Sequence, residues 1–288
     1  MTRQPLIAQH AEDLLGNSVV ATAPVAGGDT ATATKLRLSD GTTAIMKTVA
    51  HAPEGLFAAE AHGLRWLGEA TGEGGVAVPE VLAKDEGCII LRWIESGKAS
   101  ADVAGSFGRA LAATHRAGAA AFGAEHDGFI SSLPLPNRTA DTWAEFYAVR
   151  RVLPYLKLAR DRGHVTSDEA ATVESVIGRL TDLLPVEPPA RLHGDLWNGN
   201  VLWGQDGQIW LIDPAAYGGH RELDLAMLSL FGMPHLPRVL DAYAQAAPLA
   251  DGWEDRVPLH QLFPLLVHAA LFGGGYGSRA AEVAGRYA

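Results

Sequence analysis

The residues most able to do chemistry lie in one short block of sequence, HGDLWNGN, at positions 193–200. Within this block Asp195 precedes Asn200 by five positions, and Asp213 follows thirteen positions further on. Phosphoryl transfer from ATP requires a carboxylate that orients an attacking hydroxyl and accepts its proton, together with oxygen ligands that hold Mg²⁺. We therefore predict that Asp195 is the catalytic base and that Asn200 and Asp213 bind Mg²⁺.

A hairpin between the two expected metal ligands can bring them together in space although they are separated in sequence. The apolar runs Val201–Trp203 and Ile209–Ile212 flank Gly204–Gly207, a four-residue loop typical of a β-hairpin. Such a hairpin brings Asp213 back beside Asn200. Each polar residue alone has a simpler explanation, such as a buried histidine or a turn-forming aspartate, but their joint occurrence favours a site.

The first third of the chain is predicted to form an antiparallel sheet with one helix. Short β-rich runs occupy Val19–Val49, with a turn signal at Asp40-Gly41. Apolar residues at helical spacing predict a helix over 54–70, and two more strands are expected at 80–83 and 88–93.

The rest of the chain is predicted to be mainly helical. Helical periodicity extends over 102–118, 143–162, 167–184 and 224–231, and an apolar stretch at 262–272 predicts a buried helix. We therefore expect an α+β fold with a β-rich N-terminal part at 1–94 and a mainly helical C-terminal part at 95–288 that contains the block at 193–200.

The composition argues against several classes of function. Among 288 residues there are 23 Lys plus Arg and 33 Asp plus Glu, a net charge of −10, which disfavours a nucleic-acid-binding surface or a polybasic membrane anchor. The most apolar late stretch falls short of the ~20 residues that span a bilayer, and the N-terminus shows no export signal. The single cysteine, Cys88, can form no intrachain disulfide. We expect a cytoplasmic protein that binds neither nucleic acid nor membrane. The sequence does not determine its oligomeric state, and a monomer is favoured.

Three segments carry a resemblance to a known family. LHGDLWNGNVLW, LIDPAAYGGHRELDLAM and GFISSLPLPNRTADTWAEFYAVRRVLPYLKLAR resemble the fructosamine kinases, or ketosamine 3-kinases, and the resemblance extends over nearly the whole chain. That family belongs to the protein-kinase-like superfamily and is related to the aminoglycoside phosphotransferases. The resemblance implies a small β-rich N-lobe at 1–94 that binds nucleotide, over a helical C-lobe at 95–288 that binds substrate and carries the catalytic block. This arrangement agrees with the elements predicted above.

A lysine and a glutamate in the N-lobe complete the expected site. Lys47 ends a predicted strand, at the position where a protein-kinase-like fold places a lysine that reaches the α and β phosphates. Glu60 lies on the following predicted helix, and a carboxylate partner would fix the ammonium group. Glu69 is the alternative partner if the helix is rotated differently, and Glu54 is less favoured.

The remaining contacts to nucleotide and substrate are expected from position and resemblance. Gly27 and Gly28 allow backbone N–H groups to approach the phosphates, although the kinase motif GxGxxG is absent and a plain hairpin turn would explain them too. The resemblance implies that the backbone at Trp93 and Ile94 binds the adenine edge. It also implies that Trp197 lines the sugar-amine pocket, while simple packing explains this residue equally well.

Two further features have structural explanations. Asp224 begins a predicted helix and is most simply explained as a residue that satisfies free N–H groups there, whereas the resemblance would have it brace the catalytic block. His268 and the run GGGY at 273–276 match the family's C-terminus, but a buried histidine and a helix-ending glycine run explain them. We assign the latter two no role.

The resemblance implies an ATP-dependent kinase that phosphorylates a sugar hydroxyl of a ketosamine, with ATP and Mg²⁺ bound. The acceptor would be a small-molecule ketosamine or a glycated protein lysine. One alternative keeps the fold and changes the acceptor to an aminoglycoside, choline or homoserine. Another is a catalytically silent nucleotide-binding scaffold, which the degenerate glycine loop favours and the intact Lys47, Asp195, Asn200 and Asp213 disfavour.

Overall fold

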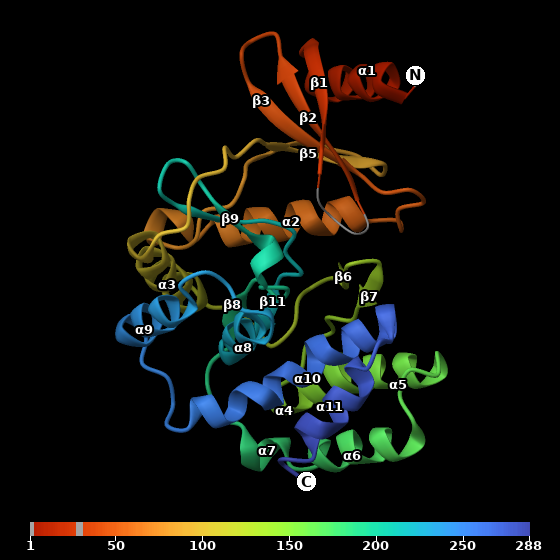
Figure 1. The fold of residues 1–288 in the computed structure, drawn as a ribbon, viewed down its shortest axis with the longest axis vertical. Coiled ribbons are helices and arrows are strands. Elements are labelled where there is room, and N and C mark those ends of the chain that lie inside the picture. The colour runs from red at the N-terminus through yellow and green to blue at the C-terminus, as the bar shows by residue number, and fades with distance from the viewer. Residues whose placement is uncertain (1–2, 27–30) are drawn as a thin grey trace.

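The computed structural model describes residues 3–26 and 31–288, and it places a β-sheet at one end of the molecule and a body of helices at the other (Figure 1). The elements expected from the sequence recur in the order in which they were predicted. The prediction of an α+β fold with an antiparallel N-terminal sheet and a helical C-terminal part is therefore confirmed.

The N-terminal sheet has five antiparallel strands in the order β1-β2-β3-β5-β4. The predicted turn at Asp40-Gly41 joins β2 to β3, and Gly41 has the positive φ of 88° that this turn requires. The strands are β1 (Val19–Val25), β2 (Thr32–Leu38), β3 (Thr43–Thr48), β4 (Val81–Lys84) and β5 (Cys88–Arg92).

Side chains that alternate along these strands pack against a helix on each face of the sheet. Leu36, Met46 and Ile90 pack against α1 (Arg3–Leu15), whereas Ile89 and Leu91 pack against α2 (Leu56–Gly68). The sequence analysis predicts α2 but not α1. The sheet thus separates two small cores, and α2 lies on the side that faces the helical body (Figure 1).

The helical body contains the predicted helices together with shorter ones. Its helices are α3 (Ala101–Arg116), α4 (Trp143–Phe146), α5 (Leu153–Asp161), α6 (Ser167–Ile177), α7 (Leu180–Leu183), α8 (Glu222–Phe231), α9 (Leu236–Ala246), α10 (Trp253–Phe272) and α11 (Tyr276–Ala284). The helix predicted over 143–162 is divided by a π-helical segment, Tyr147–Val152. The sequence analysis does not predict α9 or α11.

The buried helix expected at 262–272 is the second half of α10, which continues through an internal proline. Pro264 has no N–H to offer the carbonyl of His260 one turn earlier. The hydroxyl of Tyr147 donates to that carbonyl at 3.0 Å and to the Leu259 carbonyl at 2.8 Å. A side chain from the neighbouring helical segment therefore replaces the missing backbone hydrogen bond.

Three small strand pairs lie within the helical body, and two of them surround the block at 193–200. The predicted hairpin is present as β9 (Val201–Trp203) and β10 (Ile209–Leu211). Immediately before the block, β8 (Ala190–Leu192) pairs with β11 (Tyr217–Gly219), and β6 (Gly128–Ile130) pairs with β7 (Leu133–Leu135) elsewhere. The block therefore starts at the end of one strand pair and ends at the start of another.

Of the helices in the described part of the chain, none combines the length and the apolar character needed to cross a bilayer.

Candidate active site

The block at 193–200 is held in place by a carboxylate from α8. Asp224 lies in the first turn of α8, is 1% exposed, and accepts hydrogen bonds from the backbone N–H groups of His193 at 2.8 Å and Gly194 at 3.0 Å. Gly194 has a positive φ, and a Cβ at this position would lie 2.1 Å from the Ala215 carbonyl oxygen. The sequence left two roles for Asp224, to satisfy free N–H groups at the start of its helix or to brace the block. The structure shows hydrogen bonds to the block.

Asn200 holds the predicted catalytic base, Asp195. Its amide nitrogen donates to the backbone carbonyl of Asp195 at 2.8 Å and to carboxylate Oδ2 at 3.1 Å. Burial, together with the negative charges of Asp213 and Asp224, raises the pKa of Asp195 to about 7 against the opposing effect of the Asn200 hydrogen bond. A carboxylate with a pKa near neutrality is suited to accept a proton.

The hairpin returns the chain to the block as predicted. The backbone N–H of Ile212 donates to the carbonyl of Asn200 at 3.1 Å, and a ring nitrogen of His193 lies 2.9 Å from the Ile212 carbonyl. The next residue, Asp213, adopts a left-handed φ of 54°. These contacts place Asp213 beside Asn200, and its charge is close enough to act on the pKa of Asp195.

The N-lobe contributes an ammonium group to the same place. Lys47 Nζ lies 2.7 Å from Glu60 Oε1 and 2.5 Å from Asp213 Oδ1. Burial alone would lower the pKa of Lys47, but the negative charges of Asp213 and Glu60 more than offset it and raise that pKa. Lys47 therefore remains charged. Glu69, the alternative partner, instead forms an ion pair with Arg191 at 3.0 Å.

The residues expected to bind adenine lie where the sheet joins the helical body. The backbone N–H of Trp93 donates to the Thr43 carbonyl at 3.1 Å, and Ile94 follows directly. Beyond them, the N–H of Gly97 donates to the Trp203 carbonyl at 2.6 Å, which attaches the linker to the β9–β10 hairpin. Trp93 and Ile94 thus border the site, and their contact with nucleotide stays a prediction.

Two of the remaining predicted residues, Gly27 and Gly28, lie outside the described residues. Trp197, 38% exposed, projects from the block with its ring centroid 5.9 Å from that of Phe231. The Phe231 ring in turn lies 5.0 Å from His268. From the sequence, His268 was assigned no role because a buried histidine explains it, and Phe231 was not considered.

The donor set at Asn200 and Asp213 fits a hard divalent cation. Because the amide nitrogen of Asn200 is engaged with Asp195, its carbonyl oxygen is the atom that it can offer a metal. Asp213 directs Oδ1 to Lys47, and a carboxylate has a second oxygen to offer. Oxygen ligands of this kind are those that Mg²⁺ prefers.

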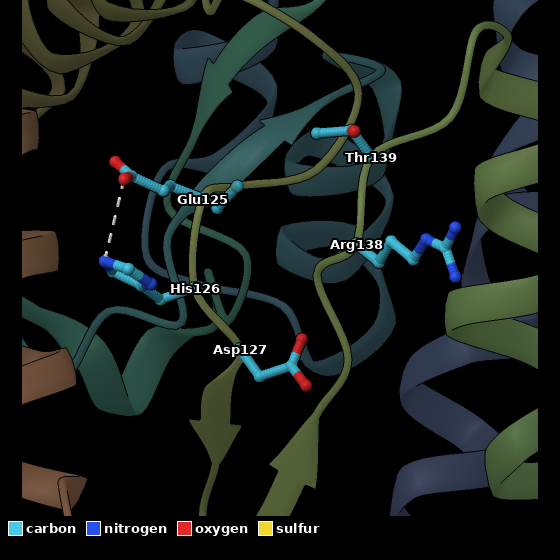
Figure 2. A pocket seen from close by; sticks show the side chains of 6 residues that line it. Glu125, His126, Asp127, Arg138 and Thr139 are labelled. Atoms are coloured by element: carbon cyan, nitrogen blue, oxygen red, sulfur yellow. Dashed lines mark ion pairs between the residues drawn. The ribbon is translucent and has the colours of Figure 1, made fainter.

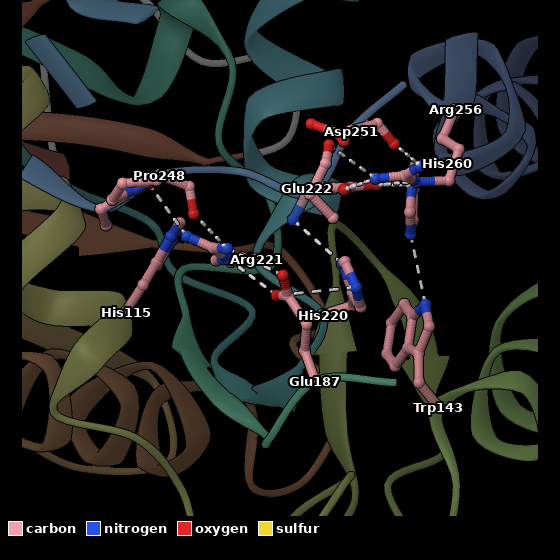
Figure 3. A network of polar contacts seen from close by, with 12 residues as sticks. His115, Trp143, Glu187, His220, Arg221, Glu222, Pro248, Asp251, Arg256 and His260 are labelled. Carbon is pink, nitrogen blue, oxygen red and sulfur yellow. Dashed lines mark hydrogen bonds and ion pairs between the residues drawn. The ribbon is translucent and has the colours of Figure 1, made fainter. Parts of the chain in front are cut away.

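A buried ion network supports α8 behind the block, and Figure 3 shows it from close by. Glu187 accepts two hydrogen bonds from the guanidinium of Arg221, both at 2.7 Å. Glu222 accepts two from Arg256, at 2.6 and 3.0 Å. Bidentate arginine–carboxylate pairs of this type fix the orientation of both side chains as well as neutralising their charges. They therefore hold the start of α8, two residues before Asp224, in one position.

Two histidines in this network lie close enough to Glu222 to suggest a metal site, but their hydrogen bonds argue against one. An indole N–H only donates, so the contact from Trp143 makes His260 Nε2 the acceptor and leaves the hydrogen on Nδ1. His220 Nδ1 accepts from the N–H of Glu222 at 3.3 Å, so its hydrogen is on Nε2. Both nitrogens that would bind the metal therefore carry hydrogen.

A surface cavity is bordered by residues outside the predicted site. It measures about 410 Å³ and is bordered by polar residues on either side of the β6–β7 hairpin, as Figure 2 shows. Its lining consists of Ala124, Glu125, His126, Asp127, Arg138 and Thr139. Among these described residues, none belongs to the predicted site.

Comparison with known proteins finds similarity over almost the full chain. The family model described as fructosamine kinase matches residues 3–287. A probable ketoamine kinase of Thermus thermophilus is 38% identical over 233 residues, which cover 81% of this chain and 82% of that protein.

Solved structures show the same similarity. A candidate fructosamine-3-kinase from Thermobifida fusca has 48% sequence identity and a TM-score of 0.91, with 96% of each chain covered. The choline kinase LicA from Streptococcus pneumoniae has 16% identity and a TM-score of 0.66, with 99% of this chain and 98% of that chain covered. At that identity, the second match shows only a shared fold.

Proposed function

This chain belongs to the fructosamine kinase family, and from that membership and the site geometry we propose that it transfers the γ-phosphoryl group of ATP to a sugar hydroxyl of a ketosamine. The observation that carries the proposal is the contact of Lys47 from the N-lobe with Asp213, beside the Asp195–Asn200 pair. An ammonium group, two metal-binding oxygens and a base thus converge on one place.

Each residue then has a role in the transfer. Asp195 accepts the hydroxyl proton as the new bond to the γ-phosphorus forms and the bond to the β–γ bridging oxygen breaks, which releases ADP. Lys47, oriented by Glu60, binds the α and β phosphates, and Asn200 and Asp213 hold Mg²⁺. When bound, Mg²⁺ neutralises negative charge on the phosphates. The protein contributes mainly position and preorganised charge.

The acceptor is proposed to be a glycated amine, either a small-molecule ketosamine or a glycated lysine of a protein. The exposed ring of Trp197 supplies a surface on which its sugar or amine part can lie. The net charge of −10 suits an acceptor that carries an amine.

Substrate profiling with product mapping tests the proposal. Purified protein with Mg²⁺ and ATP is assayed on ribulosamine, fructosamine, an aminoglycoside and choline, and the phosphorylated position is located by NMR. Phosphorylation of a sugar hydroxyl of the ketosamines is expected. Activity on only the last two acceptors would contradict the choice of substrate, and nucleotide binding without transfer to any would indicate a scaffold.

The role of Asp195 is tested with Asp195→Asn. Turnover is expected to fall by about 10²–10⁴-fold, the range for loss of a general base, while ATP binding is largely retained. Asp182→Asn, an exposed change of the same kind on α7, is the matched control and should leave turnover unchanged. Wild-type turnover in Asp195→Asn would refute the assignment.

A further inference from the structure

The position of α2 matters to the proposed reaction because this helix carries Glu60, the partner of Lys47. Lys47 itself belongs to β3 of the sheet, whereas Asp195 and Asp213 belong to the helical body. What holds α2 relative to that body therefore determines where the ammonium group stands relative to the base and the metal ligands.

The C-terminal end of α2 is attached to the strand that leads into the catalytic block. Arg191 of β8 donates to the Trp66 carbonyl and forms an ion pair with Glu69 Oε2 at 3.0 Å. Its guanidinium carbon also lies 4.7 Å from the centroid of the Trp66 ring, and its side chain is only 12% exposed. The last carbonyls of a helix lack intrahelical partners and form its negative end, so a cation there is favoured.

The same guanidinium reaches a third segment. Arg191 Nε donates to the carbonyl of Gly118, just after α3, at 3.3 Å. In β8 the residue is paired with Gly218 of β11 and stands two positions before His193. One arginine therefore joins the end of α2 to the end of α3 and to the entry of the catalytic block.

The middle of α2 lies directly on the segment that follows Asp213. A Cβ added to Gly63 would lie 3.1 Å from Pro214 Cγ and 3.3 Å from Ala216 Cβ, closer than ordinary contacts. Gly63 is one helical turn from Glu60, so this close approach and the Lys47 ion pair lie near each other along α2.

The chain after α2 is also embedded in the helical body. Val76 is 1% exposed and packs in the same apolar cluster as Leu196 and Leu211, and its N–H donates to Thr114 Oγ1 at 2.8 Å. The Leu211 N–H donates to the Ala77 carbonyl at 2.9 Å. In Figure 1, α2 correspondingly lies between the sheet and the body. By its contacts α2 is attached to both.

We propose that Arg191 is a positioning residue for phosphoryl transfer. It fixes α2 against the helical body, so that Glu60 holds the ammonium group of Lys47 in contact with Asp213 and close to Asp195. The proposal rests on the proposed function. The hydrogen bonds and the ion pair of Arg191 are made with Trp66, Glu69 and Gly118, none of which is a predicted site residue, so Arg191 acts through Glu60.

A double-mutant cycle between Arg191→Gln and Glu60→Gln tests the proposal, with kcat and the KM values of ATP and ketosamine as readouts. Arg191→Gln is expected to lower kcat by about tenfold. The ketosamine KM should be unchanged, because Arg191 contacts Trp66, Glu69 and Gly118 rather than Trp197. If Arg191 acts through Glu60, the double variant should be no slower than Glu60→Gln alone, because the two changes remove the same constraint. Fully additive losses in kcat would overturn the proposal.

Two comparisons separate positioning from stability. Arg116→Gln removes another arginine that donates to a carbonyl at a helix end, that of Ala246 in α9, and should leave kcat unchanged. Gly63→Ala should lower kcat because the added methyl group pushes α2 away from Pro214, and this loss too should disappear in a Glu60→Gln background. A loss of kcat in Arg191→Gln that persists in the Glu60→Gln background, or an equal loss in Arg116→Gln, would overturn the proposal.

Failure of the proposed function is distinguishable from failure of this inference. The first is read on the wild-type protein, as absence of transfer to ketosamines. The second is measured as the ratio of kcat values between variants. This ratio can be determined with any acceptor that is phosphorylated, or from ATP hydrolysis.

Discussion

The catalytic block and the Lys47–Glu60 pair serve the same site but are held in different ways. The block is continuous in sequence, and Asp224 binds its backbone N–H groups from a buried position. The pair joins a strand to a helix, and Asp213 contacts it from a third segment through a charge. The predicted catalytic block, called the catalytic side below, is thus held by backbone hydrogen bonds in the core. The Lys47–Glu60 pair, called the nucleotide side because it is predicted to bind phosphates, is held by ion pairs between the sheet and the helical body.

This difference has energetic consequences. Removal of a buried acceptor leaves its donors unsatisfied, at about 1–3 kcal/mol for each group. An ion pair between partly buried groups gains less, because desolvation of both charges offsets much of their attraction. Changes on the catalytic side should therefore reduce both stability and activity. Removal of both charges of the Lys47–Glu60 pair together should reduce mainly activity.

The largest effect is expected for Asp224→Asn. An amide can accept from only one of the two backbone N–H groups and presents its own N–H₂ to the other, so the free energy of unfolding should fall by about 3 kcal/mol. Urea denaturation measures this change, and turnover should fall with it because the block loses its support. A loss of stability below about 0.5 kcal/mol would contradict the contrast drawn between the two sides.

The double variant Lys47→Met/Glu60→Leu should show the opposite balance. Replacement of both charges by apolar side chains of similar size removes the ion pair without leaving one buried charge, so stability should stay within about 1 kcal/mol of wild type. Phosphoryl transfer should fall by about 10²–10³-fold, the usual cost of removing one preorganised electrostatic group. The single variant Lys47→Met, which leaves Glu60 unpaired, should be less stable than the double variant.

The smallest effect concerns pH and again belongs to the catalytic side. Burial, together with the charges of Arg221 and Arg256, lowers the pKa of His220 to about 3, and burial lowers that of His260 well below its usual value. Above the unfolded pKa of about 6.5 neither state binds a proton, so the contribution of these neutral histidines is complete. As the pH falls below 6.5 the unfolded chain takes up protons that the folded protein does not, and stability falls.

Between pH 6.5 and 5.5 this loss should be about 1 kcal/mol for each histidine. Urea midpoints at the two pH values measure it, and His220→Gln should reduce the slope. His126→Gln, at an exposed position, should leave the slope unchanged. An unchanged slope in His220→Gln would show that this buried ring does not contribute to the pH dependence.

The elements with local signals could be predicted, and those that depend on a distant partner could not. The hairpin at 201–212 and the sheet around Asp40-Gly41 have alternating apolar residues and a turn, which are properties of neighbouring residues. The three-residue strands β8 and β11 are too short for any periodicity, and they exist because each pairs with the other. The π-helical segment at 147–152 likewise leaves no local pattern that differs from a regular helix.

The same distinction applies to the site. The proximity of Asp195, Asn200 and Asp213 could be predicted from residue type and spacing, because the hairpin that joins Asn200 to Asp213 is short. The supports could not: Asp224 was left with two roles, and the ion network around Glu222 was not predicted at all, since its members come from segments far apart.

The order of residues along the chain was sufficient to predict the chemistry, because the predicted base, the predicted metal ligands and the hairpin between them occupy a single short stretch. It favoured Glu60 as the partner of Lys47, which the structure confirms, but it left Glu69 as the alternative. The choice between them depends on the rotation of α2, which contacts the helical body at Gly63 and, through Glu69, at Arg191. The raised pKa of Asp195 is likewise a tertiary property, because burial and the charges of Asp213 and Asp224 exist only after folding.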